Sequence, residues 1–135
     1  MSFQLKYQKI ISTHIYEIAA GILILLATIL RIAMVSLGWP IKDADESVMN
    51  LEALHIAERG ERPIFFYGQH YLGVLEAYTG ALLFRLFGPS AQVMRYEMVV
   101  FTAGFLVCLY ILTSKLYTRA FALITVGLFL FGNYG

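Results

Sequence analysis

Long apolar runs separated by one more polar stretch dominate the chain. The first run extends from about residue 17 to residue 38 and is interrupted only by Arg31. The second extends from about residue 94 to 114, and the third from about residue 120 to 135, where the sequence ends. A helix of about 20 apolar residues crosses the roughly 30 Å hydrocarbon core of a bilayer. The pattern predicts three transmembrane helices. Because the third is cut off within the membrane, we expect the chain to be the N-terminal part of a larger protein.

The stretch between the first two runs, about residues 41–92, begins with a helix start signal. Asp43 is a good N-cap residue, and Glu46 follows it at the spacing of a capping box. Gly60 is a typical residue just after a helix end. These signals predict a helix over about residues 44–59.

A second helix is predicted in the same stretch, over about residues 71–87. Pro63 breaks the preceding helical pattern, and residues 64–67 favour extended chain or a turn. The second helix is mostly apolar but contains Glu76 and Arg85. Such a helix suits the membrane interface, or packing against the spans, better than crossing the bilayer. The predicted architecture is therefore two juxtamembrane helices between the first and second transmembrane helices of a polytopic helical bundle.

The composition agrees with an all-α membrane protein. Hydrophobic residues make up 59% of the chain and charged residues 14%, whereas soluble domains are about 45–50% apolar and about 25% charged. The formal net charge of +1 gives no reason to expect nucleic acid as a partner. The single cysteine, Cys108, has no partner for an internal disulfide.

The basic residues near the helix ends predict the orientation. Lys6 and Lys9 precede the first run, and Lys115 and Arg119 lie between the second and third. The positive-inside rule makes that side cytoplasmic. We therefore expect a multi-pass protein of the cell membrane, with a cytoplasmic N-terminus and an extracytoplasmic loop at about residues 41–92.

The chemistry of the loop centres on an acidic pair, Asp45 and Glu46, just beyond the first span. Carboxylates in this position can take a proton from a hydroxyl or hold a cation. The structural alternative is that both acids stabilise the N-terminal end of a helix dipole, by about 0.3–1 kcal/mol each. Because Asp43 alone would satisfy the cap, a functional role is favoured for Asp45 and, less strongly, for Glu46.

Several features of the loop together resemble the start of a GT-C glycosyltransferase, of the protein O-mannosyltransferase and lipid A aminoarabinose transferase branch. The resemblance covers about residue 39 to the C-terminus. The features are the acidic pair 45–46, the stretches 65–73 and 75–78, the segment 86–90, and Arg95. The resemblance implies an inverting enzyme that moves a sugar from a polyprenyl-phosphate donor to a lipid, glycan or protein acceptor at the outer membrane face.

The resemblance also implies roles for individual residues. Asp45 matches the first-loop aspartate of the family and is expected to be the base that activates the acceptor. Glu46 matches the adjacent glutamate, which supports that base, binds a metal or contacts the acceptor. Arg95, at the outer end of the second span, can fork onto a phosphate; alternatively, it snorkels or pairs with Glu97 or Glu76.

The remaining site candidates are predicted to bind substrate. Tyr67, Gln69 and His70 are candidates for the lining of a sugar or phosphate pocket, although aromatic residues at this depth are often belt anchors. Glu76 is a carboxylate within an apolar helix, which favours either function or an ion pair with an arginine.

The sequence leaves the metal, the oligomeric state and one alternative function open. Asp45 and Glu46 offer two oxygen ligands to a divalent cation, too few to define a site. The expected partners are the lipid-linked donor and membrane lipids. The alternative is a non-catalytic polytopic protein, such as a transporter fragment or an assembly subunit; acids at an interface rather than at mid-membrane favour the enzyme. The 135-residue chain alone is expected to be inactive, because one loop and three spans can hardly enclose both substrates.

Overall fold

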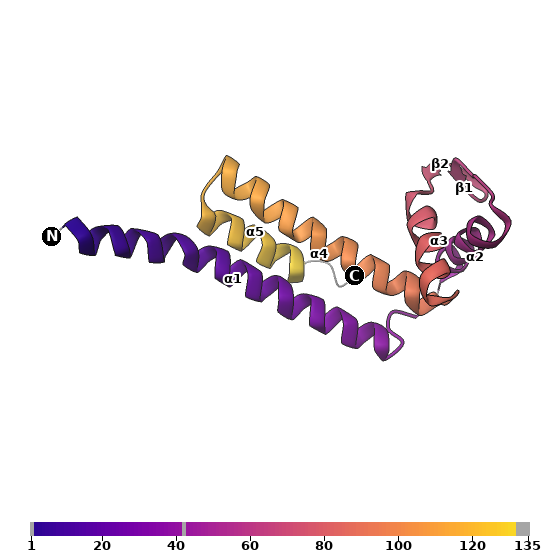
Figure 1. Ribbon diagram of the computed structural model, residues 1–135, viewed down its shortest axis with the longest axis horizontal. Coiled ribbons are helices and arrows are strands. Elements are labelled where there is room, and N and C mark those ends of the chain that lie inside the picture. The colour runs from indigo at the N-terminus through magenta and orange to yellow at the C-terminus, as the bar shows by residue number, and fades with distance from the viewer. Residues whose placement is uncertain (1, 42, 132–135) are drawn as a thin grey trace. The chain divides into compact units, whose positions relative to one another are not determined.

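The computed structural model describes the backbone of residues 2–41 and 43–131 and the side chains of residues 14–41 and 43–130. This part of the chain is mostly helical and contains one short β-hairpin (Figure 1). In chain order, the elements are α1 (Ser2–Ser36), α2 (Ala44–Arg59), β1 (Phe65–Phe66), β2 (Gln69–Gly73), α3 (Leu75–Phe87), α4 (Ala91–Leu116) and α5 (Arg119–Phe131).

The chain divides into two compact units. The terminal unit consists of residues 1–31 and 101–135, and the central unit consists of residues 32–100. The terminal unit contains most of α1, the second half of α4, and α5. The central unit contains the end of α1, α2, the hairpin, α3 and the start of α4.

In the terminal unit the three helices pack through a small apolar core. Leu106 of α4 and Val126 and Leu130 of α5 are buried. Partly buried residues of α1 and α4 pack against them: Leu23, Ile24, Ala27 and Tyr110. The rings of Phe105 and Phe129 also meet, with centroids 4.9 Å apart.

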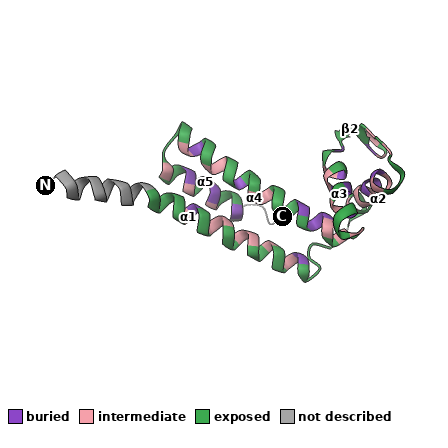
Figure 2. Ribbon diagram, viewed as in Figure 1, coloured by how far each residue is buried: buried purple, intermediate pink, exposed green. Residues whose placement is uncertain are grey.

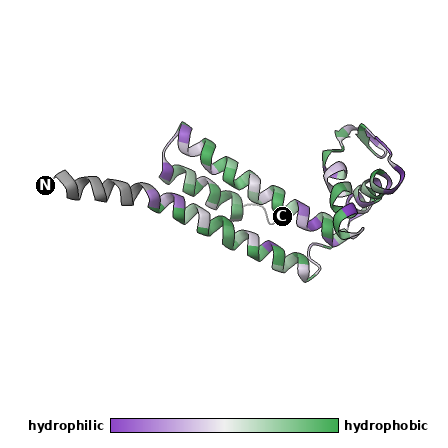
Figure 3. Cartoon of the chain, in the orientation of Figure 1, coloured by the Kyte–Doolittle hydropathy of each residue, from purple (hydrophilic) through white to green (hydrophobic). Residues whose placement is uncertain are grey.

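Two described helices contain segments that are long and apolar enough to cross a membrane, His14–Ser36 in α1 and Ala91–Leu116 in α4. They agree with the first two predicted spans, and Figure 3 shows how apolar residues dominate both. Their large apolar side chains are mostly exposed within the chain (Figure 2), as expected of helices that face lipid. The third predicted span is not confirmed, because α5 has 13 residues and residues 132–135 lie outside the described part.

One ion pair in the terminal unit joins α1 to the start of α5. Nη2 of Arg119, at the start of α5, lies 3.7 Å from a carboxylate oxygen of Glu17 in α1. The beginning of the apolar segment of α1 and the connection between α4 and α5 therefore lie at the same end of this unit. That arrangement agrees with the predicted grouping of the basic residues on one side.

In the central unit, α2 has the bounds that its local signals predict. Asp43 is the N-cap and Gly60 ends the helix in the left-handed conformation, with a φ of 68°. The capping box is only half formed: Asp43 caps the helix, but the Glu46 side chain reaches Arg95 instead of turning back.

The predicted start of the next helix, at residue 71, is wrong. Residues 69–73 form β2, which pairs with β1 in an antiparallel hairpin, and α3 begins only at Leu75. Gly68 has a φ of 81° and allows the tight turn between the strands. Phe66, on the short partner strand, is buried in the core of the unit. Backbone pairing with β1 therefore prevents helix formation through residues 69–73.

Small residues allow the helices of the central unit to approach closely. Ala53 of α2 and Ala77 of α3 are fully buried in the common core. Gly80 faces α4: a Cβ there would lie 2.1 Å from the Met94 sulfur. Larger side chains complete the core, among them Ile56, Phe66, Val74 and Phe84.

Glu52 is an unfavourable group in this core. It is 0% exposed, and neither carboxylate oxygen has a hydrogen-bond partner of good geometry. Burial raises the pKa of Glu52 above its ordinary value of 4.5, and the backbone of Tyr67 opposes that shift only in part. An ionised carboxylate without partners is expensive in an apolar interior.

This environment predicts a pH-dependent stability. A carboxyl whose pKa is raised by folding binds more protons in the folded than in the unfolded state. Its contribution is fully present below the unfolded pKa and is lost as the pH rises through the folded pKa. Glu52→Gln should therefore stabilise the protein at neutral pH and reduce the loss of stability with rising pH. Thermal unfolding in lipid nanodiscs, from about pH 5 to about pH 8, measures both effects.

The matched control is Glu58→Gln, which changes an exposed glutamate of the same helix and should leave the pH dependence unchanged. A Glu52→Gln protein with wild-type stability at every pH would contradict the inference that folding raises the pKa of Glu52.

Candidate functional site

The site begins with the cap of α2. The Asp43 carboxylate accepts the Glu46 backbone N–H at 2.7 Å, and the Ser47 hydroxyl donates to the Asp43 carbonyl at 3.0 Å. These bonds satisfy groups that a helix start otherwise leaves unpaired. The predicted capping role of Asp43 is thus confirmed.

Glu46 and Arg95 form a bidentate ion pair. Nε and Nη2 of Arg95 donate to the two Glu46 carboxylate oxygens at 2.6 Å and 2.7 Å. The third guanidinium nitrogen donates to the Gly38 carbonyl at 3.4 Å. The Arg95 side chain is 9% exposed and that of Glu46 is 22% exposed. The structure therefore brings together two of the predicted site residues, one near the start of α2 and one near the start of α4.

This pairing changes the expected role of Arg95. The sequence suggested Glu97 or Glu76 as acidic partners, but the partner is Glu46, and Glu97 instead accepts a hydrogen bond from the Thr79 hydroxyl. Because all three guanidinium nitrogens already donate to protein oxygens, a phosphate could use the fork of Arg95 only by displacing Glu46.

Unlike Glu46, the adjacent residue Asp45 does not take part in the ion pair with Arg95. It is exposed, and it makes no hydrogen bond or ion pair with any described residue. The cap and the ion pair therefore fix the helical turn that carries Asp45, while no described residue binds its exposed carboxylate.

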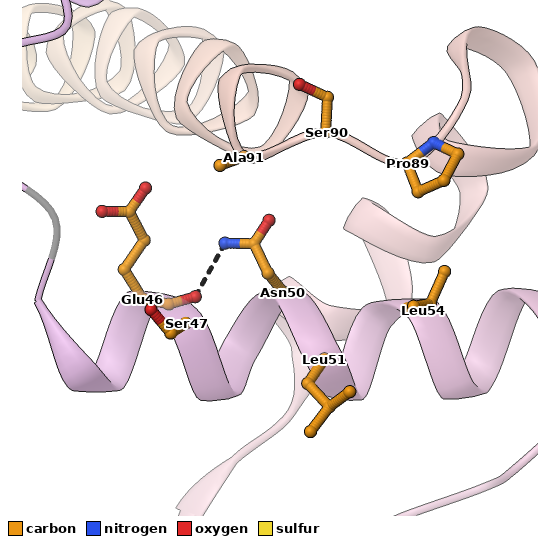
Figure 4. A pocket seen from close by; sticks show the side chains of 8 residues that line it. All are labelled: Glu46, Ser47, Asn50, Leu51, Leu54, Pro89, Ser90 and Ala91. Atoms are coloured by element: carbon orange, nitrogen blue, oxygen red, sulfur yellow. Dashed lines mark hydrogen bonds between the residues drawn. The ribbon is translucent and has the colours of Figure 1, made fainter.

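An open cleft of about 370 Å³ lies beside Glu46 (Figure 4). The first turns of α2 form one wall, and the residues that lead into α4 form the other. The lining combines polar and apolar groups: Glu46, Ser47, Asn50, Leu51, Leu54, Pro89, Ser90 and Ala91. The Asn50 amide donates to the Glu46 carbonyl at 2.7 Å, whereas its oxygen is buried without a partner. A cleft of this volume is at the lower end of the range for small-molecule sites.

Tyr67 belongs to a different cluster. Its hydroxyl donates to Glu61 and lies 3.2 Å from Nδ1 of His55. The hydrogen bond to Glu61 is the main cause that raises the pKa of Tyr67 to about 12. His55 follows Glu46 by nine positions in α2, which is roughly 14 Å along a helix. The structure therefore does not place Tyr67 beside the acidic pair.

The other predicted substrate-binding residues lie on the hairpin and α3. Gln69 is half-buried and His70 exposed on β2, where the His70 ring meets Phe65 edge to face. Glu76, in the first turn of α3, is half-buried, and burial raises its pKa. None of the three lines the cleft or bonds to Asp45 or Glu46 within the described residues.

Sequence reasoning missed His55, Glu61 and Asn50 as parts of polar clusters. His55 and Glu61 become neighbours of Tyr67 only through the hairpin, so no short-range spacing indicates them. Asn50 lies four residues after Glu46, on the same helix face. This spacing of four residues was the only feature of the sequence that placed Asn50 near Glu46.

The described residues contain no group of three or more histidine, cysteine, aspartate or glutamate side chains placed to hold a metal ion. The two acids of the pair also face different surroundings, because Glu46 is bound by Arg95 and Asp45 is exposed.

Comparison with known proteins adds no relative. No protein-family model, no curated protein and no solved structure matches the chain.

The ion pair makes a prediction about stability. Glu46→Gln or Arg95→Gln alone should each lower the free energy of unfolding by about 3–5 kcal/mol, because each leaves a largely buried charge without its partner. The double variant should lose much less than the sum. A double-mutant cycle on denaturant unfolding in nanodiscs measures this coupling.

The control is the exposed pair of Glu17 and Arg119, with side chains 45% and 41% exposed. Its coupling should be about 0.2–1 kcal/mol. Additive losses at Glu46 and Arg95 would show that the two side chains do not act as a unit.

Proposed function

We propose that this chain belongs to a membrane glycosyltransferase of GT-C type, which transfers a sugar from a polyprenyl-phosphate donor to a lipid, glycan or protein acceptor at the outer membrane face. The observation that carries the proposal is the carboxylate of Asp45, which is exposed, has no partner among the described residues, and lies on a helical turn fixed by a cap and a part-buried ion pair. A mostly helical fold with two long apolar helices agrees with a polytopic membrane enzyme.

In the proposed reaction, Asp45 is the general base. The acceptor hydroxyl oxygen attacks the anomeric carbon of the sugar, and the hydroxyl proton passes to the Asp45 carboxylate. The bond between the anomeric carbon and the phosphate oxygen breaks, and its electron pair leaves with the polyprenyl phosphate. Attack from the face opposite the leaving group inverts the anomeric centre. A positioned base typically contributes about 10²–10⁴-fold to such a step.

Glu46 and Arg95 support this base as positioning residues. Their ion pair holds the first turn of α2 against the start of α4, so the direction of the neighbouring Asp45 is constrained. Because the guanidinium is occupied, we assign Arg95 to this supporting role rather than to direct phosphate binding.

The cleft beside Glu46 is a reasonable place for the hydroxyl-bearing end of the acceptor. It offers the polar side chains of Ser47, Asn50 and Ser90 next to apolar leucine and proline surfaces. Sugars combine hydroxyl groups with apolar ring faces, and a mixed lining suits both. Tyr67, Gln69, His70 and Glu76 remain candidates for contacts with the donor.

We also propose that the protein spans the membrane three times within this chain, with its N-terminus in the cytoplasm and residues 41–92 outside. The pair of Glu17 and Arg119 supports this arrangement, because it joins the start of α1's apolar segment to the connection between α4 and α5. Both positions then lie on the cytoplasmic side.

A non-catalytic role is the second candidate, and one observation favours it. Two of the three acids at the start of α2 have structural roles: Glu46 pairs with Arg95, and Asp43 caps the helix. A transporter or assembly subunit could use the same turn purely as a scaffold.

Asp45→Asn tests the catalytic proposal. The change keeps the shape of the side chain but removes the base, whose ordinary pKa is about 3.9. Turnover of the full-length protein should fall by about 10²–10⁴-fold, with membrane insertion and thermal stability nearly unchanged. Transfer is measured with a panel of polyprenyl-phosphate sugars.

The matched control is Asp43→Asn, which should stay active because asparagine caps a helix as well as aspartate does. Wild-type transfer by both variants would remove Asp45 from the mechanism. Loss of activity in Asp43→Asn alone would identify the wrong carboxylate. The absence of transfer with every donor would favour the non-catalytic role.

The proposed topology is tested by cysteine labelling in a Cys108→Ala background. A cysteine at the exposed position Glu58 should react in intact cells with a thiol reagent that cannot cross membranes. A cysteine at Tyr117, 67% exposed in the connection between α4 and α5, should react only after the cells are opened. The reverse labelling pattern would invert the topology and place Asp45 in the cytoplasm.

A further inference from the structure

The β-hairpin of residues 65–73 depends on its contacts with the rest of the central unit. A two-stranded hairpin is at best marginally stable in water without further packing, and β1 contains only two residues. Phe66 anchors the hairpin by burial in the core that α2 and α3 share. The next residue, Tyr67, anchors it through hydrogen bonds of its hydroxyl. The groups around that hydroxyl therefore help to hold the hairpin on α2.

Side chains from three parts of the unit meet at the Tyr67 hydroxyl. The hydroxyl donates to Glu61, in the connection between α2 and β1. Nδ1 of His55, in α2, lies 3.2 Å from the same hydroxyl and 3.8 Å from the other carboxylate oxygen of Glu61. The rings of His55 and Tyr67 are tilted against each other, with centroids 5.9 Å apart. The cluster thus joins α2, the connection and the hairpin.

The hydrogen bonds assign the proton positions of the neutral cluster. Tyr67 has a single hydroxyl proton, and Glu61 accepts it. Because the pKa of Tyr67 is raised to about 12, the phenol keeps that proton at neutral pH. The Tyr67 oxygen can then only accept from His55, so Nδ1 must carry the proton of the neutral imidazole. Nε2 is left unprotonated, and it is the atom that takes up a proton when the pH falls.

Protonation at Nε2 adds a positive charge without breaking any of these hydrogen bonds. Nδ1–H continues to donate to Tyr67, and the charged ring lies within ion-pair distance of Glu61. The His55 side chain is 18% exposed and that of Glu61 is 38% exposed. Water therefore screens their attraction only in part, while the ring keeps some hydration, which limits the cost of burying its charge. The cluster holds its parts together more tightly when His55 is charged.

Two further ionisable groups of α2 act on the cluster. Arg59 competes for Glu61, because its Nη1 also lies 3.8 Å from that carboxylate. Its side chain is 65% exposed, so this contact is the more strongly screened one. Glu52, about one turn before His55, is fully buried, and burial raises its pKa. Glu52 is therefore a second group that can take up a proton as the pH falls, and an experiment must remove it.

The neighbouring elements contribute groups that are exposed or already bonded. From α3, Arg85 donates to the backbone carbonyls of Ile56 and Ala57, and the Tyr78 hydroxyl donates to the Pro63 carbonyl. Burial raises the pKa of the half-buried Glu76 of the same helix. The other ionisable residues between positions 56 and 73 are exposed: Glu58, Arg62, His70 and Tyr71.

We propose that His55, Tyr67 and Glu61 form a pH-sensitive latch that holds the β-hairpin on α2, and that protonation of His55 strengthens it. Histidine is the side chain whose charge ordinarily changes between about pH 5 and about pH 8. The hairpin is accordingly held more tightly at mildly acidic pH, and it opens more often as the pH rises through that range. The latch consists of contacts within the central unit, so it depends neither on the proposed sugar transfer nor on the proposed membrane insertion.

The latch bears on two of the residues predicted to bind substrate. Gln69 and His70 lie on β2, directly after the turn that follows Tyr67. Closing the latch restricts the positions of both side chains, and opening it frees them. In the proposed enzyme, mildly acidic pH therefore holds this part of the donor contacts in place.

Hydrogen exchange of the backbone amides of residues 64–73 measures the opening of the hairpin. The chain is studied in nanodiscs by mass spectrometry at about pH 5.5 and about pH 8, on either side of the range in which histidine titrates. Rates are corrected for the intrinsic exchange rate at each pH. Every protein carries Glu52→Gln, which removes the second titrating group. The opening equilibrium constant should be about two- to fivefold larger at the higher pH, as expected for a partly exposed ion pair.

Three variants assign this pH dependence. His55→Asn should remove it, because the amide N–H can take the place of Nδ1–H but does not titrate. Glu61→Gln should also remove it, since the charged ring then lacks its partner. The matched control is His70→Asn, which changes an exposed histidine of the same hairpin and should keep the pH dependence.

Several outcomes would overturn the latch. They are a pH dependence that persists in His55→Asn, one that disappears in His70→Asn, and opening that is equal at both pH values or larger at the lower one. The amides of residues 48–54 in α2 are the internal reference, and their protection should not change in His55→Asn. If that variant loses protection in α2, Glu61→Gln decides the result, because it leaves every side chain of α2 in place.

Discussion

The buried ion pair between Glu46 and Arg95 is the constraint on which the arrangement of the central unit depends. The two residues are far apart in the chain, yet two short hydrogen bonds join them in a part-buried position at the wall of the cleft. Neither charge can remain there alone without a large desolvation cost. The pair therefore selects conformations in which the starts of α2 and α4 are adjacent, and the bond from Arg95 to Gly38 adds the chain that follows α1.

The same pair gives two neighbouring carboxylates different properties. Successive residues of an α-helix point about 100° apart. When Arg95 holds Glu46 inward, Asp45 must turn outward, and it is exposed without a partner in the part of the chain that the structure describes. Meanwhile Asp43 satisfies the cap of α2. Three acids within four positions thus have three roles: cap, buried partner and accessible carboxylate. Local geometry produces this division even though the three side chains have similar chemistry.

Sequence patterns predicted the features that depend on local interactions. Asp43 and Gly60 were sufficient for the bounds of α2, because caps act within a single helical turn. The predicted start of α3 was wrong, because strand pairing between residues 65–66 and 69–73 competes with helix formation there. The partner of Arg95 could not be predicted from the sequence. Glu97 and Glu76 are closer to Arg95 along the chain, and only tertiary packing brings Glu46 into contact with it. The contact of Tyr67 with His55 has the same origin.

The outer sides of α2 and α3 in the central unit differ in polarity. Its polar outer helix, α2, carries the accessible carboxylate, while α3 exposes several large apolar side chains and uses its Arg85 to donate to the carbonyls of Ile56 and Ala57. A unit built for water alone would gain nothing from exposing Leu75, Leu82 and Leu86. A unit placed between water and lipid gains from both faces. In the proposed reaction, such a position would keep the Asp45 carboxylate in water while a lipid-linked sugar and a hydroxyl-bearing acceptor meet beside the membrane.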